Sequence, residues 1–560
     1  MLLSMKQNSE EVLRDLTVRY EELRQERVQF QPRWTEAQEF VDSAILDWNT
    51  LGNVPKQPNR YSSLPCNYLN VLVNGLVGYS ISPNIVWFKL SLADQTKLNL
   101  YGVKDWLETC EEIMLAKFNA SNLYTQASKF ITDAAVIGHG VMLIDEDIKQ
   151  QRLRYTKLPA NEIYLDINEY GEVDTVYRRY NMTIRNCVSF FGEDKLDSKI
   201  VDEYKDPKKW NHPVEIIQAV FPRKEYDPEY KDAKNKPVAV YWIDNTNHKI
   251  IDESGYDDIP YAVFYWDRLP GFAYGTSPAQ NAICDIKGLN IAKKTSWTIA
   301  QTSAEPPMKI SEDIREVNIT PRGHTYVTSA DQIIEPIRTG DNYPITLEVL
   351  EGMKQDIKDW FNVDFFLMLQ QKTAQMTATE VMELQGEKAA TLSNLIVNLN
   401  EALLKIIQRS FDILMRSGEL PPPPMSLVQE GGAGGMKVDF VGPLAQAQKK
   451  YHTMGGTLQA LNTAGPIMQM FPNAGDYIDG DVLMKAALEG QGMPQRVIRE
   501  DDDVKKLRQQ RIEEQQQAAA AAQQQQMAQA LMQNANKLNQ PVEQNSLMEE
   551  LNNQLGAAFR

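Results

Sequence analysis

The chain has 560 residues, of which 42% are hydrophobic, so it is long enough for several domains with substantial cores. Its formal net charge of −17 at pH 7 argues against a protein that binds nucleic acid tightly by neutralising phosphates. No stretch approaches the roughly 20 consecutive apolar residues of a membrane-spanning helix, so we expect no membrane segment.

The first half of the chain predicts a body of mixed helices and strands. Apolar spacing predicts helix over residues 5–50 and, after a polar link at 53–60, further helices from Pro65 to about Gly138. His139 is expected in a turn between two glycines, where helix changes to strand. The predicted strands are residues 141–144, 163–165, 173–180, 214–221, 238–243 and 261–266. The fold class is therefore α+β.

A long helix with clear ends is predicted at residues 278–304. Ser277 is suited to cap it, and Pro278 takes the first helical position, where a missing N–H is tolerated. Glu305 and the two prolines after it end the helix. Its apolar positions are Ile283, Ile286, Leu289, Ile291, Ala292, Ile299 and Ala300. At 1.5 Å per residue this helix would be about 40 Å long.

A short β-containing insert at residues 308–337 separates this helix from a second one at about 344–368. The apolar positions of the second helix are Leu347, Leu350, Ile357, Trp360 and Phe361. Two long helices that flank a small β insert predict a stalk with a tip.

A polar loop at residues 370–376 precedes a third long helix. Thr377 and Glu380 are spaced as a capping box, and Gly418 supplies the C-terminal stop. Gly386 is the expected bend. Residues 437–441 then alternate as a strand that returns to the body, residues 444–500 are again helical, and a Gln- and Ala-rich tail follows, which we expect to be disordered or partly helical.

Catalytic and metal-binding motifs are incomplete. Residues 288–295 approach a phosphate-binding loop, but Lys293 stands where the second glycine is required and the segment lies within a predicted helix. Neither the five histidines nor the four scattered cysteines have the spacing of metal ligands, and the cysteines suggest synthesis in a reducing cytoplasm. We therefore predict no enzyme activity, no cofactor and no metal.

Four motifs in a fixed order carry a resemblance to a known family. They are Tyr-Gly-Thr-Ser-Pro-Ala at 274–279, Asp-Ile-Lys-Gly-Leu-Asn at 285–290, Met-Thr-Ala-Thr-Glu-Val at 376–381 and Val-Gly-Pro-Leu-Ala-Gln-Ala-Gln at 441–448. In these motifs the chain resembles the portal proteins, the head-to-tail connectors of short-tailed bacteriophages. The resemblance covers most of the chain, to about residue 500.

The resemblance implies a portal fold assembled as a ring. The expected parts are a wing at 1–276, a first stem helix at 277–304, a clip at 305–342, a second stem helix at 343–368, a tunnel loop at 369–378, a long kinked helix with a returning wing strand at 379–443, a crown at 444–500, and a tail at 501–560 that is either disordered or a helical barrel.

By the same resemblance, the ring would be a dodecamer at one capsid vertex of the virion, made in the host cytoplasm, through which double-stranded DNA is packaged and later ejected. The implied partners are the terminase packaging motor, a tail adaptor, the major capsid and scaffolding proteins and internal ejection proteins. The net charge would suit an acidic channel wall that keeps the duplex from sticking, although solubility alone explains it equally well.

Two sets of residues are candidates for contact with DNA. The resemblance places the tunnel loop in the channel, and its residues are Gln370, Gln371, Lys372, Thr373 and Gln375. Lys372 would touch phosphates without reading sequence, but an ordinary solvated connection is also open. Lysines on the stalk could face DNA or pair with neighbouring subunits. They are Lys287, Lys293, Lys294 and Lys354.

Two other functions stay open at this point. One is a tail or scaffolding component that oligomerises without conducting DNA. The other is the packaging ATPase, against which the incomplete phosphate-binding loop argues.

Overall fold

The computed structural model of the chain describes residues 9–42, 45–48, 58–147, 152–224, 232–312, 347–370, 392–429, 435–443 and 506–518, with short pieces at 51, 56, 150, 226, 329, 331, 334–336, 504 and 525–526. The chain forms two compact units, residues 1–477 and 478–560. In the second unit, the described residues 506–518 are helical. All elements below belong to the first unit.

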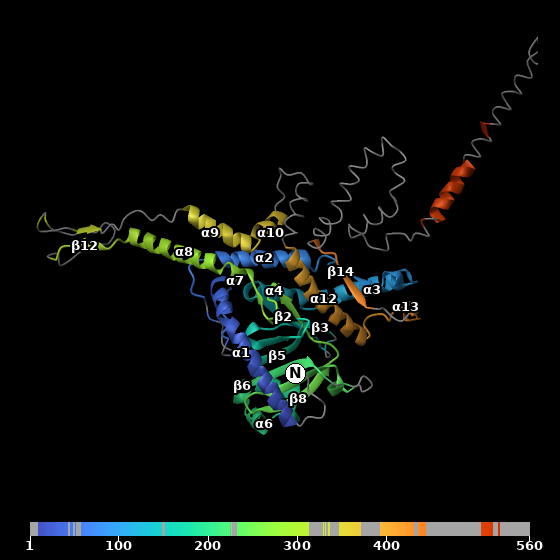
Figure 1. Cartoon of the computed structure of the whole chain (residues 1–560), viewed down its shortest axis with the longest axis horizontal. Helices are drawn as coiled ribbons and strands as arrows, with labels where there is room; N and C mark the ends of the chain where they lie inside the picture. The colour runs from blue at the N-terminus through green and yellow to red at the C-terminus, as the bar shows by residue number, and fades with distance from the viewer. Residues whose placement is uncertain are drawn as a thin grey trace, which may run out of the picture. The chain divides into compact units, whose positions relative to one another are not determined.

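The first helix, α1 (Ser9–Val41), belongs to two hydrophobic cores (Figure 1). Its N-terminal half packs on a β-sheet through Val12, Leu16, Tyr20 and Leu23. Its C-terminal half joins the larger core through Trp34, Ala37 and Val41. Pro32, which cannot donate a helical hydrogen bond, lies between the two halves. Of the predicted helix at 5–50, the described residues 45–48 are not helical, because Ile45 forms a β-bridge with Lys56 instead.

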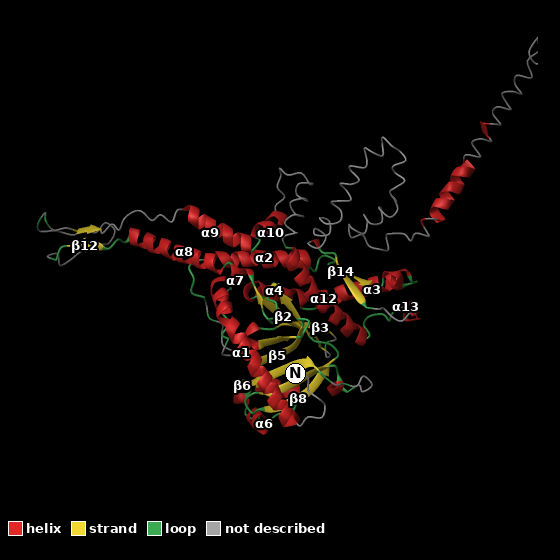
Figure 2. Ribbon diagram, viewed as in Figure 1, coloured by secondary structure: helices red, strands yellow, loops and turns green. Residues whose placement is uncertain are grey.

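The sheet under α1 is a five-stranded antiparallel meander of the described residues (Figure 2). Its strands are β4 (Ile163–Ile167), β5 (Val173–Thr183), β6 (Pro213–Pro222), β7 (Val238–Asp244) and β8 (Lys249–Tyr256). Two helices, α5 (Ile184–Phe191) and α6 (Ser198–Tyr204), connect β5 to β6. Alternation along β6 turns Ile217 and Phe221 toward α1 and Ile216 and Val220 toward the larger core, so both faces are buried.

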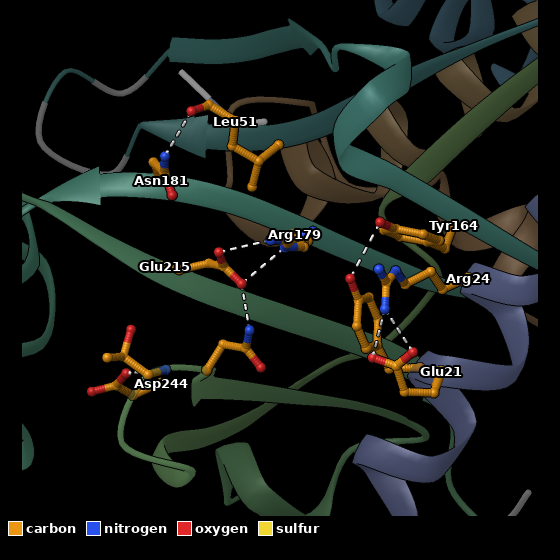
Figure 3. Close-up of polar contacts among 11 residues, drawn as sticks. Glu21, Arg24, Leu51, Tyr164, Arg179, Asn181, Glu215 and Asp244 are labelled. Carbon is orange, nitrogen blue, oxygen red and sulfur yellow. Dashed lines mark hydrogen bonds and ion pairs between the residues drawn. The ribbon is translucent and has the colours of Figure 1, made fainter. Parts of the chain in front are cut away.

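Figure 3 shows polar contacts within the sheet and between the sheet and α1. Arg179 on β5 donates two hydrogen bonds of 2.8 Å to the carboxylate of Glu215 on β6. The hydroxyl of Tyr20 on α1 donates to that of Tyr164 on β4 at 3.2 Å. The first pair joins two neighbouring strands, and the second joins α1 to the sheet.

The larger core holds a three-stranded sheet in the order β3 (Arg152–Lys157), β2 (His139–Asp147), β9 (Tyr261–Tyr265). The helices α2 (Leu64–Ser80), α3 (Val103–Ala120) and α4 (Leu123–Ile137) and the long α12 (Ser393–Arg416) pack with it. The buried Arg409 of α12 donates to the carbonyl oxygens of Ile144 at 2.9 Å and Asp258 at 3.0 Å. The predicted stop of this helix is confirmed, because Gly418 has φ +74°.

The predicted returning strand is also confirmed. It is β14 (Met436–Phe440), which follows the short α13 (Met425–Gln429) and pairs antiparallel with β1 (Phe88–Leu92), with Phe88 opposite Phe440. The chain after α12 is thereby fastened to the N-terminal body. Sequence reasoning missed β1, which lies inside a region expected to be helical.

The stalk leaves the body after the two-stranded pair β10 (Asp267–Arg268) and β11 (Gly275–Thr276). It consists of α7 (Pro278–Asn281), α8 (Ile283–Ala304), the paired strands β12 (Met308–Ile310) and β13 (Ile334–Pro336), and α9 (Leu347–Trp360), which leads to α10 (Val363–Gln370). We use the name stalk helices for α8 and α9.

Candidate functional site

The stalk begins at a buried cap. The Ser277 hydroxyl accepts a hydrogen bond from the N–H of Gln280 at 3.1 Å and donates one to the carbonyl oxygen of Val136, at the end of α4, at 2.7 Å. Pro278 takes the first helical position, so the predicted start of the helix is confirmed. The predicted helix at 278–304 is divided at Ala282 into α7 and α8.

The two stalk helices lie against each other (Figure 1). Leu289 of α8 and Ile357 of α9 are fully buried, and a Cβ atom at Gly288 would lie 3.4 Å from the Cε of Met353. The small residue therefore permits close packing of α9 on α8. Residues 288–295 are helical, as predicted, and Gly288 serves helix packing.

The second stalk helix differs from the prediction of one helix at 344–368. Of its described residues, α9 ends at Trp360, and Asn362 has φ +49° before α10 begins at Val363. Asparagine tolerates this left-handed conformation better than most residues. After the break α10 packs on α2, where a Cβ atom at Gly75 would overlap the ring of Phe366. The break therefore redirects the chain from the stalk to the body.

Three of the four candidate lysines have partners in their own chain. Lys287 forms an ion pair with Glu36 of α1, and Lys354 lies 2.5 Å from the carboxylate of Glu351. The ammonium group of Lys294 is exposed and lies 5.5 Å from the centre of the Tyr61 ring. Lys293 is half-buried and has no ion-pair partner among the residues that the structure describes.

Of the tunnel-loop candidates, only Gln370 lies within the described residues. Gln370 ends α10. Gln371, Lys372, Thr373 and Gln375 lie outside the described residues, as do the predicted capping box, the bend at Gly386 and the crown at 444–500. Their expected positions stay predictions.

The stalk helices expose several large apolar side chains. Ile291 is 64% exposed, Trp297 62% and Trp360 45%. Sequence reasoning counts Ile291 and Trp360 in the apolar stripes of these helices and misses Trp297. Trp297 lies outside the row of apolar residues that α8 buries, so α8 has apolar residues on more than one face. This pattern could have been read from the sequence.

An open depression lies beside Trp360 at the junction of the stalk helices. The described residues that line it are Asp285 of α8 and Asp356, Asp359 and Trp360 of α9. Asp359 accepts a hydrogen bond from the side-chain amide of Gln355 at 2.9 Å. Three carboxylates around one indole make this side of the stalk both acidic and apolar.

Besides Arg409, the described part of the body encloses the basic groups of His139 and Arg27. The ring of His139 lies 5.2 Å from those of Trp34 and Tyr274, and burial lowers the pKa of His139 to about 3, so it is neutral. The expectation of a turn residue is wrong, since His139 is the first residue of β2. Arg27, 1% exposed, donates to the carbonyl oxygens of Asn161 and Ile163, both at 2.9 Å.

These enclosed groups support the fold. The Arg27 guanidinium also lies 3.8 Å from the centre of the Tyr164 ring, and burial lowers its pKa. Within the described ranges, no group of three or more His, Cys, Asp or Glu side chains is placed to hold a metal ion. No helix in the described part of the chain has both the length and the apolar character needed to cross a membrane.

Comparison with known proteins gives one family and two relatives. The sequence model of the family described as "Bacteriophage head to tail connecting protein" matches residues 13–498. The chain is 28% identical over 493 residues to the "Portal protein" of Salmonella phage epsilon15, which covers 85% of this chain and 87% of that protein. It is 28% identical over 481 residues to the "Probable portal protein" of Bordetella phage BPP-1, which covers 83% of this chain and 85% of that one.

Proposed function

Because the chain belongs to the bacteriophage head-to-tail connecting protein family, we propose that its copies close into a dodecameric ring at one vertex of the phage head. Double-stranded DNA is packaged through the channel of this ring and later ejected through it. The chain is a structural connector whose action is geometric: it makes and breaks no bond.

One observation carries this proposal beyond the family match. The stalk is a pair of packed helices that ends in the β12–β13 tip, and it exposes Ile291, Trp297 and Trp360. Large apolar side chains that a stalk exposes are what a repeating neighbour would cover. Heterologous contacts of this kind close into a ring when the rotation between copies divides a full turn.

The parts of the chain receive the following roles. The clip at 305–342, which includes β12 and β13, docks the terminase packaging motor and later the tail adaptor. The wing at 1–276 and the crown at 444–500 lie within the capsid, next to the major capsid, scaffolding and internal ejection proteins. The protein is thus part of the virion.

The DNA contact is non-specific. The net charge of −17 keeps the channel wall from binding the duplex tightly, while the tunnel loop at 369–378 touches it. Lys372 supplies a weak contact with phosphates, which fits a duplex that must slide. The ion pairs of Lys287 and Lys354 leave these two side chains less available for DNA than Lys294.

Electron microscopy of the purified full-length protein tests the proposal. A ring with an axial hole wide enough for a duplex, about 20 Å, is the expected result. Monomers or fibres would contradict it. Closed rings without a hole would favour a non-conducting tail or scaffold oligomer, and ATP hydrolysis by the purified protein would favour the packaging ATPase.

A second experiment tests the tunnel loop. Lys372→Ala and a deletion of residues 370–374 are expected to reduce DNA packaging or retention in phage particles while rings still form. Lys129→Ala is the matched control, because it removes the same charge from an exposed position of α4 in the body. Normal packaging and retention in both loop variants would show that the loop does not contact DNA.

A further inference from the structure

The two stalk helices carry opposite charge on their outer sides. Lys293, Lys294 and Trp297 follow one another on α8, whereas the exposed Asp356 and Asp359 with Trp360 mark the side of α9. We call the first set the basic edge and the second, with Asp285, the acidic depression. Each set combines charge with one largely exposed indole.

The two sets face different ways. At 3.6 residues per turn, Lys294 lies about half a turn around α8 from Asp285, Trp297 about a third of a turn and Lys293 about a fifth of a turn. The contacts agree with this estimate, since Gly288 of α8 faces Met353 of α9 while Lys294 lies over Tyr61. A single chain therefore cannot bring its own basic edge into its own acidic depression.

Each set contains charged groups that have no ion-pair partner among the described residues, although Lys294 lies over Tyr61 and Asp359 accepts a hydrogen bond from Gln355. Among the described residues, Asp285 and Asp356 have no ion-pair partner, although lysines pair with other carboxylates close by. Trp360 is 45% and Trp297 62% exposed, which is unusual for two tryptophans in packed helices. Both features are explained if another polypeptide covers these sides.

We propose that the basic edge of one copy docks in the acidic depression of the next, so that Lys293, Lys294 and Trp297 meet Asp285, Asp356, Asp359 and Trp360 of a second copy of this chain. The inference rests on the proposed ring and deepens it by naming the side chains that join neighbours. The two surfaces differ, so the contact is heterologous and repeats around an axis. Each copy supplies one half of two separate contacts.

Charge reversal in two complementary variants tests this contact. The first variant is Lys293→Glu with Lys294→Glu, which makes both sides of the stalk acidic. The second is Asp356→Lys with Asp359→Lys, which makes both sides basic. Each alone is expected to form at least about tenfold fewer rings than the unchanged protein, because like charges meet at every contact.

An equimolar mixture of the two variants should restore rings. Copies of the two kinds would alternate, so that every acidic side meets a basic one, and an even subunit number accommodates this. The control, Lys129→Glu with Lys199→Glu, makes the same charge change on α4 and α6 and should assemble normally. Failure of the mixture to form rings, or normal rings from either variant alone, would overturn the inference.

A disulfide cross-link between neighbouring copies tests the contact in rings that have already assembled. In a Cys284→Ser background, Lys294→Cys combined with Asp359→Cys should give a ladder of covalent oligomers when the rings are oxidised with diamide, and each single cysteine should give none. Rings that yield no ladder would refute the contact and leave the proposed function standing. If the unchanged protein formed no rings, the proposed function itself would fail first.

Discussion

The body and the stalk differ in the surroundings of their large side chains. In the body, Arg27 of α1 is enclosed by carbonyl oxygens and aromatic rings. Arg409 of α12 likewise donates hydrogen bonds to carbonyl oxygens. In the stalk, Ile291, Trp297 and Trp360 remain largely exposed. The body also exposes large apolar side chains, such as Tyr101, Tyr170 and Phe190, so exposure alone does not separate the two regions. What distinguishes the body is its extensive hydrophobic core and its enclosed arginines. Substitutions should therefore affect the stability of the single chain most in the body and least in the stalk.

The largest effect is expected for Arg27→Ala. The substitution leaves buried carbonyl oxygens without a donor and opens a cavity beside Tyr164, so it should lower the free energy of unfolding by about 4 kcal/mol. Arg33→Ala, at an exposed position of the same helix, should change it by less than about 0.5 kcal/mol. Denaturant titration followed by tryptophan fluorescence measures both free energies of unfolding. Equal losses in the two variants would contradict the special role of the enclosed Arg27.

The next effect is expected where the chain returns from the stalk to the body. Gly75→Ala places a methyl group into the ring of Phe366 and should lower the free energy of unfolding by about 2 kcal/mol. Gly78→Ala on the same helix meets no atom within 4 Å and should be neutral or slightly stabilising. A thermal melt of both variants gives the difference. If the two behaved alike, α10 would not be anchored on α2.

A pH-dependent effect is expected at Glu111, where α3 meets β1. Its carboxylate accepts a hydrogen bond from the N–H of Leu90 at 2.6 Å, and burial raises its pKa from an ordinary 4.5 to about 7. Between these values the folded chain keeps a proton that the unfolded chain has released. The stabilisation from this group is therefore complete below pH 4.5 and is lost as the pH rises through 7.

Glu111→Gln should accordingly stabilise the body by about 1 kcal/mol at pH 8 and change little at pH 5, because the amide keeps an acceptor without the buried charge. The neighbouring Glu112→Gln, which is exposed, serves as the control. Thermal melts of both variants at the two pH values measure the effect. The same gain at both pH values would show that ionisation of Glu111 is not its cause.

The smallest effect is expected for Lys287→Ala at the base of the stalk. Its ion pair with Glu36 is partly exposed, and such pairs contribute less than about 1 kcal/mol. A double-mutant cycle with Glu36→Ala isolates the pair. A coupling above about 2 kcal/mol would mean that the stalk, like the body, is held rigid by its own chain.

Sequence predicted the elements whose ends have their own chemistry. Ser277 and Pro278 start the stalk, and Gly418 stops α12, because caps and left-handed turns depend on a few adjacent residues. The α+β class and the strands from β4 to β7 are also confirmed, since their apolar runs are long. The break at Asn362 was missed, because no glycine or proline marks it.

Other features depend on partners that are remote in sequence. The strand β3 was missed although Leu153 and Tyr155 alternate with polar residues, because the alternating stretch is short and its pairing with β2 completes the strand. His139 reads as a turn residue beside two glycines, but Trp34 and Tyr274 enclose it. Within the candidate site, Lys287 pairs with a residue 251 positions away, which no local pattern indicates.

Pro32 divides α1 into two halves that pack in different cores. On one side of it the helix belongs to the sheet, and on the other it belongs to the core beneath the stalk. A bend at this residue would break no hydrogen bond that proline could make, so the two halves can each follow the direction that their separate contacts require. Pro32 is therefore the position at which a protein engineer would exchange one half of α1 and keep the other.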